Sequence, residues 1–242
     1  QMRSLDIGAT GMLAQQLNVE VISNNIANMN TAGFKSESVL FSEYLSEIEG
    51  DAAKLGDLSF VLDRGVARDM TEGSLENTSS ALDMAIFGDG FFTVETERGE
   101  RYTRNGHFGT DDLGRLTTRD GDAVLDENGQ EIILDLAEEI TVSEDGVIST
   151  SAGEVARLGL VRFEKPELLT KEGGALYASE DEPVEVEEVR IKQGMLESSN
   201  VAPILEMTKM IDISRAYQSA SKMIETASEL TRKAVDKLGQ QK

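Results

Sequence analysis

The chain has 242 residues, enough for one or two domains with a hydrophobic core. It contains no cysteine and a single histidine, His107, which excludes disulfides and thiol chemistry and leaves little for zinc binding or serine–histidine catalysis, so we expect no metal, no cofactor and no enzymatic activity. A net charge of −22 also disfavours nucleic acid as a partner, because such binding depends on lysine and arginine contacts to phosphate.

The negative charge is confined to the middle of the chain. Residues 1–30 and 201–242 together carry a net charge of +1, whereas residues 31–200 carry −23. Acidic residues keep an exposed domain soluble, while nearly neutral ends suit segments that pack against protein. The ends and the middle are therefore expected to lie in different surroundings.

The N-terminal segment is predicted to form a helix that other protein surfaces bury. Between Ile7 and Asn30 the only charged residue is Glu20, and the apolar residues point to nearly every side of a 3.6-residue helix. Polar residues interrupt the apolar run before the ~20 residues that a bilayer span needs, so no membrane insertion is expected. The segment also lacks the basic region and small-residue cleavage site of a signal peptide, so we do not expect it to be a secretory signal.

The middle of the chain is predicted to be rich in β-structure. Residues 31–72 and 189–200 are expected to form an extended connecting region, with a hairpin between residues 58–61 and 66–70. Residues 73–188 contain short apolar strands separated by turns rich in Asp, Asn and Gly, which predicts a small antiparallel domain or barrel. The predicted strands cover residues 91–94, 132–134, 140–142, 147–149 and 158–163.

The C-terminal segment carries a heptad seam, because small and apolar residues recur there at alternating steps of three and four. This seam runs through Met210, Ile213, Tyr217, Ala220, Ile224, Ala227, Thr231, Ala234 and Leu238. A matching seam at the N-terminus runs through Leu5, Ala9, Met12, Gln16, Val19, Ser23 and Ile26. The fold class is therefore predicted to be α+β. Residues 1–30 and 201–242 form helices that pair as a coiled coil, with a β-rich domain inserted between them.

A pair of helices covers one face of each helix and leaves the remaining apolar residues exposed, which is typical of an assembly interface. The candidate interface residues are Leu5, Ala9, Met12, Leu13, Leu17, Val19, Ile22, Ile26, Met207, Met210, Ile211, Ile213, Tyr217, Ala220, Met223, Ile224, Ala227, Leu230 and Leu238. The pattern leaves open whether these residues build a higher assembly or a single coiled coil within one chain or a homodimer.

Two segments resemble the signature motifs of the axial proteins of the bacterial flagellum, the rod, hook and hook-associated proteins. The first is Asn-Asn-Ile-Ala-Asn-Met-Asn-Thr-Ala-Gly-Phe-Lys at residues 24–35, and the second is Gln-Gly-Met-Leu-Glu-Ser-Ser-Asn-Val at residues 193–201. Residues 82–92 and 101–108 also resemble the β-domain of that family. The signature residues are Asn24, Asn25, Ala27, Asn28, Thr31, Gly33, Phe34, Gln193, Gly194, Ser199, Asn200 and Val201.

The resemblance implies a structural rod subunit that transmits torque from motor to hook in the basal body. The short segment after residues 41–45 and the sequence of residues 196–208 favour a proximal rod subunit, and a distal rod subunit is the alternative. The implied partners are further copies of the chain, inner proximal and distal rod proteins, and the flagellar type III export apparatus. The implied location is the rod of the basal body in the periplasm, and the resemblance also implies export without a cleaved signal peptide.

Two other classes of protein remain as alternatives. A peptidoglycan hydrolase needs two carboxylates, which this acidic chain could supply, although the chain has no tryptophan to line a sugar cleft. A free-standing coiled-coil binding module would form a stable dimer. His107 is expected to be packed or hydrogen-bonded rather than catalytic. The acidic run from Glu180 to Glu188 is most simply a solvated edge, with contact to a basic neighbour as the alternative.

Overall fold

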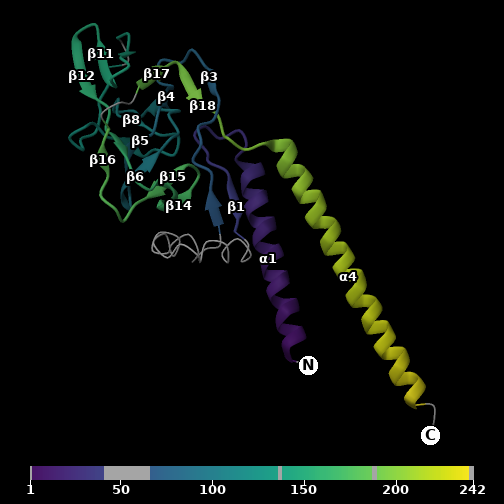
Figure 1. Cartoon of the computed structure of the whole chain (residues 1–242). Coiled ribbons are helices and arrows are strands. Elements are labelled where there is room, and N and C mark those ends of the chain that lie inside the picture. The colour runs from purple at the N-terminus through teal and green to yellow at the C-terminus, as the bar shows by residue number, and fades with distance from the viewer. Residues whose placement is uncertain (1, 41–65, 136–137, 187–189, 240–242) are drawn as a thin grey trace. The chain divides into compact units, whose positions relative to one another are not determined.

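A computed structural model describes residues 2–40, 66–135, 138–186 and 190–239, with helix side chains placed for residues 15–27 and for most of 203–226. The chain divides into two compact units (Figure 1). The helical unit contains residues 1–26 and 202–242, and the β unit contains residues 27–201. No helix among the described residues is long and apolar enough to cross a membrane.

The helical unit consists of α1 (Met2–Ala27) and α4 (Pro203–Gly239), which confirms a helix at each end of the chain. Helix α4 starts at a proline, whose fixed φ and missing N–H suit the first helical position. Helix α1 is followed by turns that end at Gly33, whose φ is +68°. The structure does not show the predicted coiled-coil pairing of the two helices.

Three two-stranded antiparallel ribbons join the start of the β unit to later parts of the same unit. They pair β1 (Glu37–Val39) with β2 (Val66–Arg68), β3 (Leu75–Asn77) with β18 (Met195–Glu197), and β4 (Met84–Phe87) with β17 (Arg190–Gln193). The predicted strand at residues 66–70 is therefore confirmed for β2, and its described partner is β1. The other half of the predicted hairpin, residues 58–61, lies outside the described residues.

The remaining strands form a nine-stranded and a three-stranded antiparallel sheet. The larger follows the order β14 (Thr170–Gly173), β15 (Leu176–Ala178), β6 (Gly99–Thr103), β5 (Phe91–Thr96), β9 (Ala123–Val124), β8 (Leu116–Thr117) and β7 (Gly109–Thr110). Strand β13 (Leu160–Arg162) also pairs with β5, and β16 (Val184–Glu185) pairs with β13. The smaller contains β10 (Thr141–Val142), β11 (Val147–Thr150) and β12 (Gly153–Arg157). A 3-10 helix, η1 (Pro166–Leu168), precedes β14.

The predicted strand at residues 132–134 is instead a single β-bridge between Ile133 and Arg115. The side chains still alternate, since Ile132 and Leu134 are buried while Ile133 is 61% exposed. Pairing stays short because the opposite segment turns at Gly114, whose φ is +79°. The other four predicted strands overlap β5, β10, β11 and β13.

Strand β5 separates two hydrophobic cores, because successive side chains of a strand point to opposite faces. Phe92 and Val94 belong to the larger core, which is mainly aliphatic. Phe91 belongs to a smaller aromatic core with Tyr102, Phe163, Leu169 and Tyr177. The rings of Tyr102 and Phe163 meet edge to face with centroids 4.8 Å apart, a favourable aromatic geometry. The β unit is therefore a well-packed body.

Candidate functional site

The candidate interface residues on the helices occupy different environments. Ile22 is buried, whereas Leu17, Ile26, Met210 and Ile213 are partly buried. The more exposed members, between 37% and 58%, are Val19, Met207, Ile211 and Tyr217. The side chains of Leu5, Ala9, Met12, Leu13, Ala220, Met223, Ile224, Ala227, Leu230 and Leu238 lie outside the described ones.

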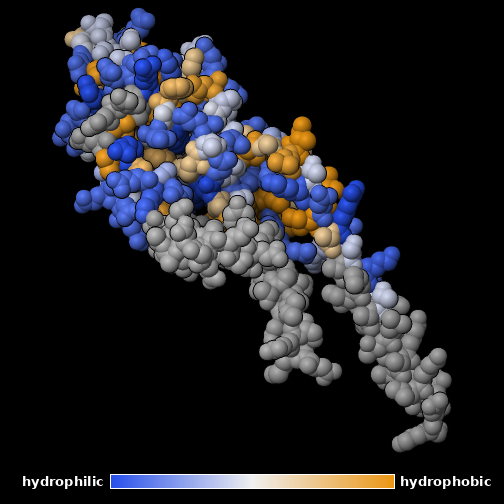
Figure 2. All heavy atoms as spheres, in the orientation of Figure 1, coloured by the Kyte–Doolittle hydropathy of each residue, from blue (hydrophilic) through white to orange (hydrophobic). Residues whose placement is uncertain are grey.

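An apolar face is exposed on the described part of α4. Ile204, Met207 and Ile211 follow one another at steps of three and four, so they share one side of the helix. They are 83%, 46% and 52% exposed, and Figure 2 shows apolar residues gathered on this part of the chain. The side of α4 that carries Met210 and Ile213 is less exposed. The face of Ile204, Met207 and Ile211, which we call the α4 apolar face, is suited to packing against another protein surface.

The signature residue Asn25 links the end of α1 to the beginning of α4. Its Nδ2 donates to Glu206 Oε2 over 3.1 Å, and both side chains are buried. Lys209 Nζ donates to the other carboxylate oxygen of Glu206 over 2.6 Å. A buried carboxylate needs such partners, so this contact holds the two helices together at one end of the helical unit.

The turn after α1 requires glycine at position 33. A Cβ atom on Gly33 would lie 2.4 Å from the backbone carbonyl carbon of Arg104, and the positive φ already disfavours other residues. The Gly33 N–H donates to the carbonyl of Glu197 over 2.7 Å. Phe34 follows and is fully buried, with Lys171 Nζ 4.0 Å from its ring centroid. The first signature motif is thus pressed against segments far along the chain.

Three buried charges meet beside this turn. Glu197 Oε1 accepts a hydrogen bond from Lys35 Nζ at 2.7 Å, and Glu197 Oε2 accepts one from Arg104 Nε at 2.8 Å. All three side chains are at most 4% exposed. We call Lys35, Arg104 and Glu197 the buried charge cluster. It joins the segment that enters the β unit to the segment that leaves it.

The buried charge cluster is also satisfied by backbone groups. Lys35 Nζ donates to the carbonyl of Thr71, the N–H of Gly73 donates to Glu197 Oε1, and Arg104 Nη1 donates to the carbonyls of Gly88 and Gly90. Burial alone would raise the pKa of Glu197, but Arg104 and Lys35 outweigh it and hold the pKa below its usual range. Burial lowers the pKa of Lys35 despite the nearby carboxylate of Glu197.

Two amide side chains of the second signature motif form hydrogen bonds with backbone N–H and carbonyl groups of other segments. Asn200 Oδ1 accepts from the Ser36 N–H, and Asn200 Nδ2 donates to the carbonyls of Asp69 and Thr71. Gln193 Oε1 accepts from the Val142 N–H, and its Nε2 donates to two further carbonyls, those of Ala81 and Ile140. An amide supplies a donor and an acceptor at once, which a carboxylate cannot. Both residues therefore tie together segments that are distant in sequence.

Other signature residues have simpler roles. The side chain of Thr31 donates to Asn28 Oδ1 within the turn, and the Val201 N–H donates to the hydroxyl of Ser199. Gly194 adopts a φ of +74° and receives hydrogen bonds from two N–H groups of the loop before β4. Asn24 and Ala27 are exposed.

Sequence reasoning missed the buried charge cluster, although each member lies inside a quoted motif. Charged residues are usually solvated, so a sequence offers no direct sign that these three are buried. His107 makes polar contacts, in line with the expectation that it is packed or hydrogen-bonded: its Nδ1 lies 2.6 Å from Oδ1 of the buried Asp83, and its Nε2 contacts Arg119. Within the described part of the chain, no three metal-binding side chains gather.

Three family profiles match the chain. One described as "Flagella basal body rod protein" matches residues 5–35, and one described as "Flagellar hook protein FlgE/F/G D1 domain" matches residues 85–150. A third, "Flagellar basal body rod FlgEFG protein C-terminal", matches residues 192–237. Each matched range contains one member of the buried charge cluster.

Similar proteins cover nearly the whole chain. It is 40% identical over 239 residues to the flagellar basal-body rod protein FlgF of Caulobacter vibrioides, covering 98% of each chain. It is 34% identical over 256 residues to FlgG of the same organism, covering 95% of this chain and 97% of that protein. It is also 34% identical over 260 residues to FlgG of Bacillus subtilis, covering 97% and 98%. Both FlgG alignments are longer than this chain, so those relatives contain residues that it lacks.

Proposed function

Because the chain belongs to the flagellar basal-body rod family, we propose that it is a subunit of the proximal rod and polymerises through α1 and α4. The protein is a structural component of the basal-body rod, it is not an enzyme, and it associates with other rod subunits. We further propose that the flagellar type III apparatus exports it to the periplasm without cleaving a signal peptide, as expected of an axial protein.

The proximal position is supported by the comparison within one organism. The chain is more similar to the FlgF protein of Caulobacter vibrioides than to its FlgG protein. The family resemblance implies that FlgF belongs to the proximal rod and FlgG to the distal rod. The alignment to FlgF spans 239 residues and the alignment to FlgG spans 256, so the FlgF alignment contains fewer gaps in this chain. A distal position in the rod is the alternative, and deletion of the gene distinguishes the two positions.

Polymerisation through the helices is supported by the α4 apolar face. Fully burying an aliphatic side chain stabilises by about 1.5–3 kcal/mol, so covering the exposed part of Ile204, Met207 and Ile211 would contribute a few kcal/mol per subunit. The nearly neutral charge of the terminal segments permits dense packing, since like charges do not accumulate there. The coiled-coil pairing of α1 with α4 belongs to the same proposal, with neighbouring subunits covering the remaining faces.

The buried charge cluster and the signature amides support torque transmission. A rod subunit must pass force between its helices and its β unit, and the chain enters and leaves the β unit at residues 27 and 201. Lys35, Glu197 and Asn200 bind these entering and leaving segments to one another and to the strands beside them. A buried, fully hydrogen-bonded network resists deformation better than an exposed one, so the segments that enter and leave the β unit would stay together under force.

Deletion of the gene in its own bacterium tests the position in the rod. For a proximal subunit, basal bodies purified from the deletion strain lack this chain and also lack the distal rod protein, and swimming is lost. The wild-type gene restores both. A shortened rod that still contains the complete set of proximal rod proteins would favour the distal assignment, and a normal rod would contradict a role in the rod.

A further inference from the structure

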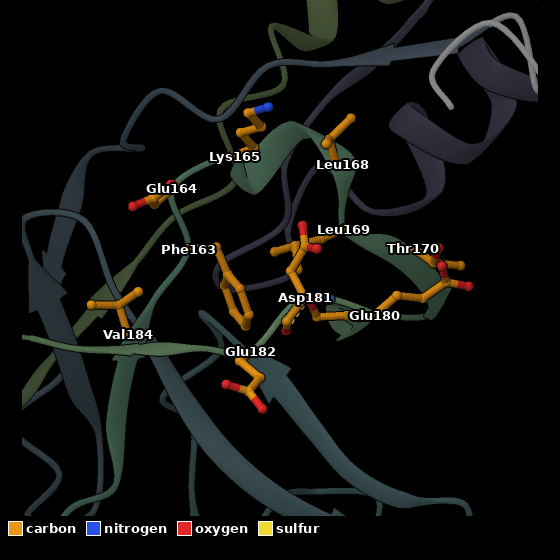
Figure 3. Close-up of a pocket in the computed structure, with 11 residues that line it drawn as sticks. Phe163, Glu164, Lys165, Leu168, Leu169, Thr170, Glu180, Asp181, Glu182 and Val184 are labelled. Atoms are coloured by element: carbon orange, nitrogen blue, oxygen red, sulfur yellow. Dashed lines mark hydrogen bonds between the residues drawn. The ribbon is translucent and has the colours of Figure 1, made fainter. Parts of the chain in front are cut away.

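A groove of about 600 Å³ lies in the β unit, and no member of the buried charge cluster lines it. Figure 3 shows the residues that line it, with Phe163 between η1 and the segment that carries Glu182. One wall is formed by η1 and the start of β14, and the other by residues 179–184, which lead into β16. No rod function assigned above uses this groove.

The groove has a rigid apolar floor. Phe163 and Leu169 line it, and each is less than 10% exposed. Both belong to the aromatic core, where Phe163 contacts the rings of Phe91 and Tyr102 edge to face at 5.7 and 4.8 Å. A floor held in place by its own packing is suited to receive an apolar side chain without rearrangement.

The rim of the groove is acidic, and its carboxylates have no cationic partner among the residues that the structure describes. Glu164, Glu180, Asp181 and Glu182 are all exposed, and their carboxylates make no hydrogen bond or ion pair with any described residue. Other acidic residues of the β unit do pair, as Glu172 does with Arg101 at 2.8 Å. The lining also includes Lys165, which has interactions of its own. Four carboxylates gathered without partners create a negative potential that a cation from outside would relieve.

An edge strand provides the third element. Among the described residues β16 pairs with β13 on one side and with no strand on the other. Its free edge offers backbone donors and acceptors to an extended segment. The turn before it is held in shape by Ser179, whose hydroxyl donates to the carbonyl of Asp181 and accepts from its N–H.

Charge identifies the kind of occupant. The chain's own residues 41–65 contain six acidic and two basic residues, so the acidic rim would repel them. A second copy would present a middle region with a net charge of −23, which the rim would repel as well. We propose that this groove is a docking site for an extended segment of another protein that carries lysine or arginine and places one apolar side chain on Phe163.

Fluorescence anisotropy on the purified full-length chain tests the proposal with a labelled eight-residue peptide of alternating lysine and leucine. The variant with Glu180→Lys, Asp181→Lys and Glu182→Lys should weaken binding by about tenfold or more. Its matched control carries Asp112→Lys, Asp120→Lys and Asp145→Lys, which change the net charge equally at exposed sites outside the groove. This control should weaken binding by less than about threefold.

A peptide of alternating lysine and serine should bind at least about tenfold more weakly, because it has no apolar side chain for the floor. Equal losses in the two triple variants would overturn the proposal, since binding would then follow net charge alone. Absence of binding, or equal binding of the two peptides, would overturn it too. The α4 apolar face is intact in every variant, so these failures would leave the rod assignment standing.

Discussion

Lys35 and Glu197 are 162 positions apart in the chain, yet their charged groups lie 2.7 Å from each other with both side chains about 1% exposed. Glu197 also binds Arg104, so one carboxylate serves two cations. The ion pair therefore connects the first signature motif to the last one inside the β unit. We expect the stability of that unit to depend strongly on this one carboxylate.

Replacing Glu197 with glutamine should destabilise the β unit by about 3–5 kcal/mol, because it leaves two buried cations without their counter-charge. Urea unfolding followed by near-ultraviolet circular dichroism reports on the unit, since Tyr102 and Tyr177 are buried in its aromatic core. The control Glu76→Gln lies on the neighbouring strand β3 in an exposed position and should change stability by less than about 0.5 kcal/mol. Equal stability of the two variants would show that the buried charge cluster contributes nothing.

The same carboxylate predicts an acid dependence. The pKa of Glu197 is lower in the folded chain than its ordinary value of 4.5. Its contribution to stability is therefore fully present above pH 4.5 and is lost as the pH falls through the lowered folded-state pKa. The stability difference between wild type and Glu197→Gln should be constant near neutral pH and shrink in strong acid. A difference that grows on acidification would contradict the direction of the shift.

Gly33→Ala should destabilise the β unit more than Gly121→Ala. Both glycines have positive φ, +68° and +94°, so both variants suffer backbone strain of about 1 kcal/mol or more. A Cβ at Gly33 also meets the backbone of Arg104 at 2.4 Å, whereas a Cβ at Gly121 has nothing within 4 Å. Thermal unfolding of the two variants measures the difference, and equal losses would mean that the turn can move away from Arg104.

The α4 apolar face predicts a separation of folding from assembly. Ile211→Asp should leave the monomer nearly as stable as wild type, because the side chain is already 52% exposed. In the assembled rod the same change buries an unpaired charge at a cost of several kcal/mol, so swimming should be lost. Ser219→Asp is a control on an exposed position of the same helix, outside that face. Normal swimming with Ile211→Asp would refute the proposed contact.

Local patterns were enough to predict both helices and several of the strands, but not the remaining strands or the contacts between distant segments. The distribution of apolar residues around α1 and the heptad seam of α4 predicted both helices. Turn residues on either side of the apolar segments predicted strands that overlap β5, β10, β11 and β13. The bridge at Ile133 shows the limit, since strand length depends on a partner that the local sequence does not contain. The buried charge cluster was missed for the same reason, because Lys35, Arg104 and Glu197 come together only when three remote segments pack.

The most direct test of the rod assignment is a cryo-electron microscopy map of basal bodies purified from the bacterium that makes this chain, at side-chain resolution. The predicted result is density for this chain in the proximal rod, with Ile204, Met207 and Ile211 packed against neighbouring subunits and the β unit facing outward. A rod without this chain, or one in which the α4 apolar face remains in solvent, would contradict assembly through the terminal helices.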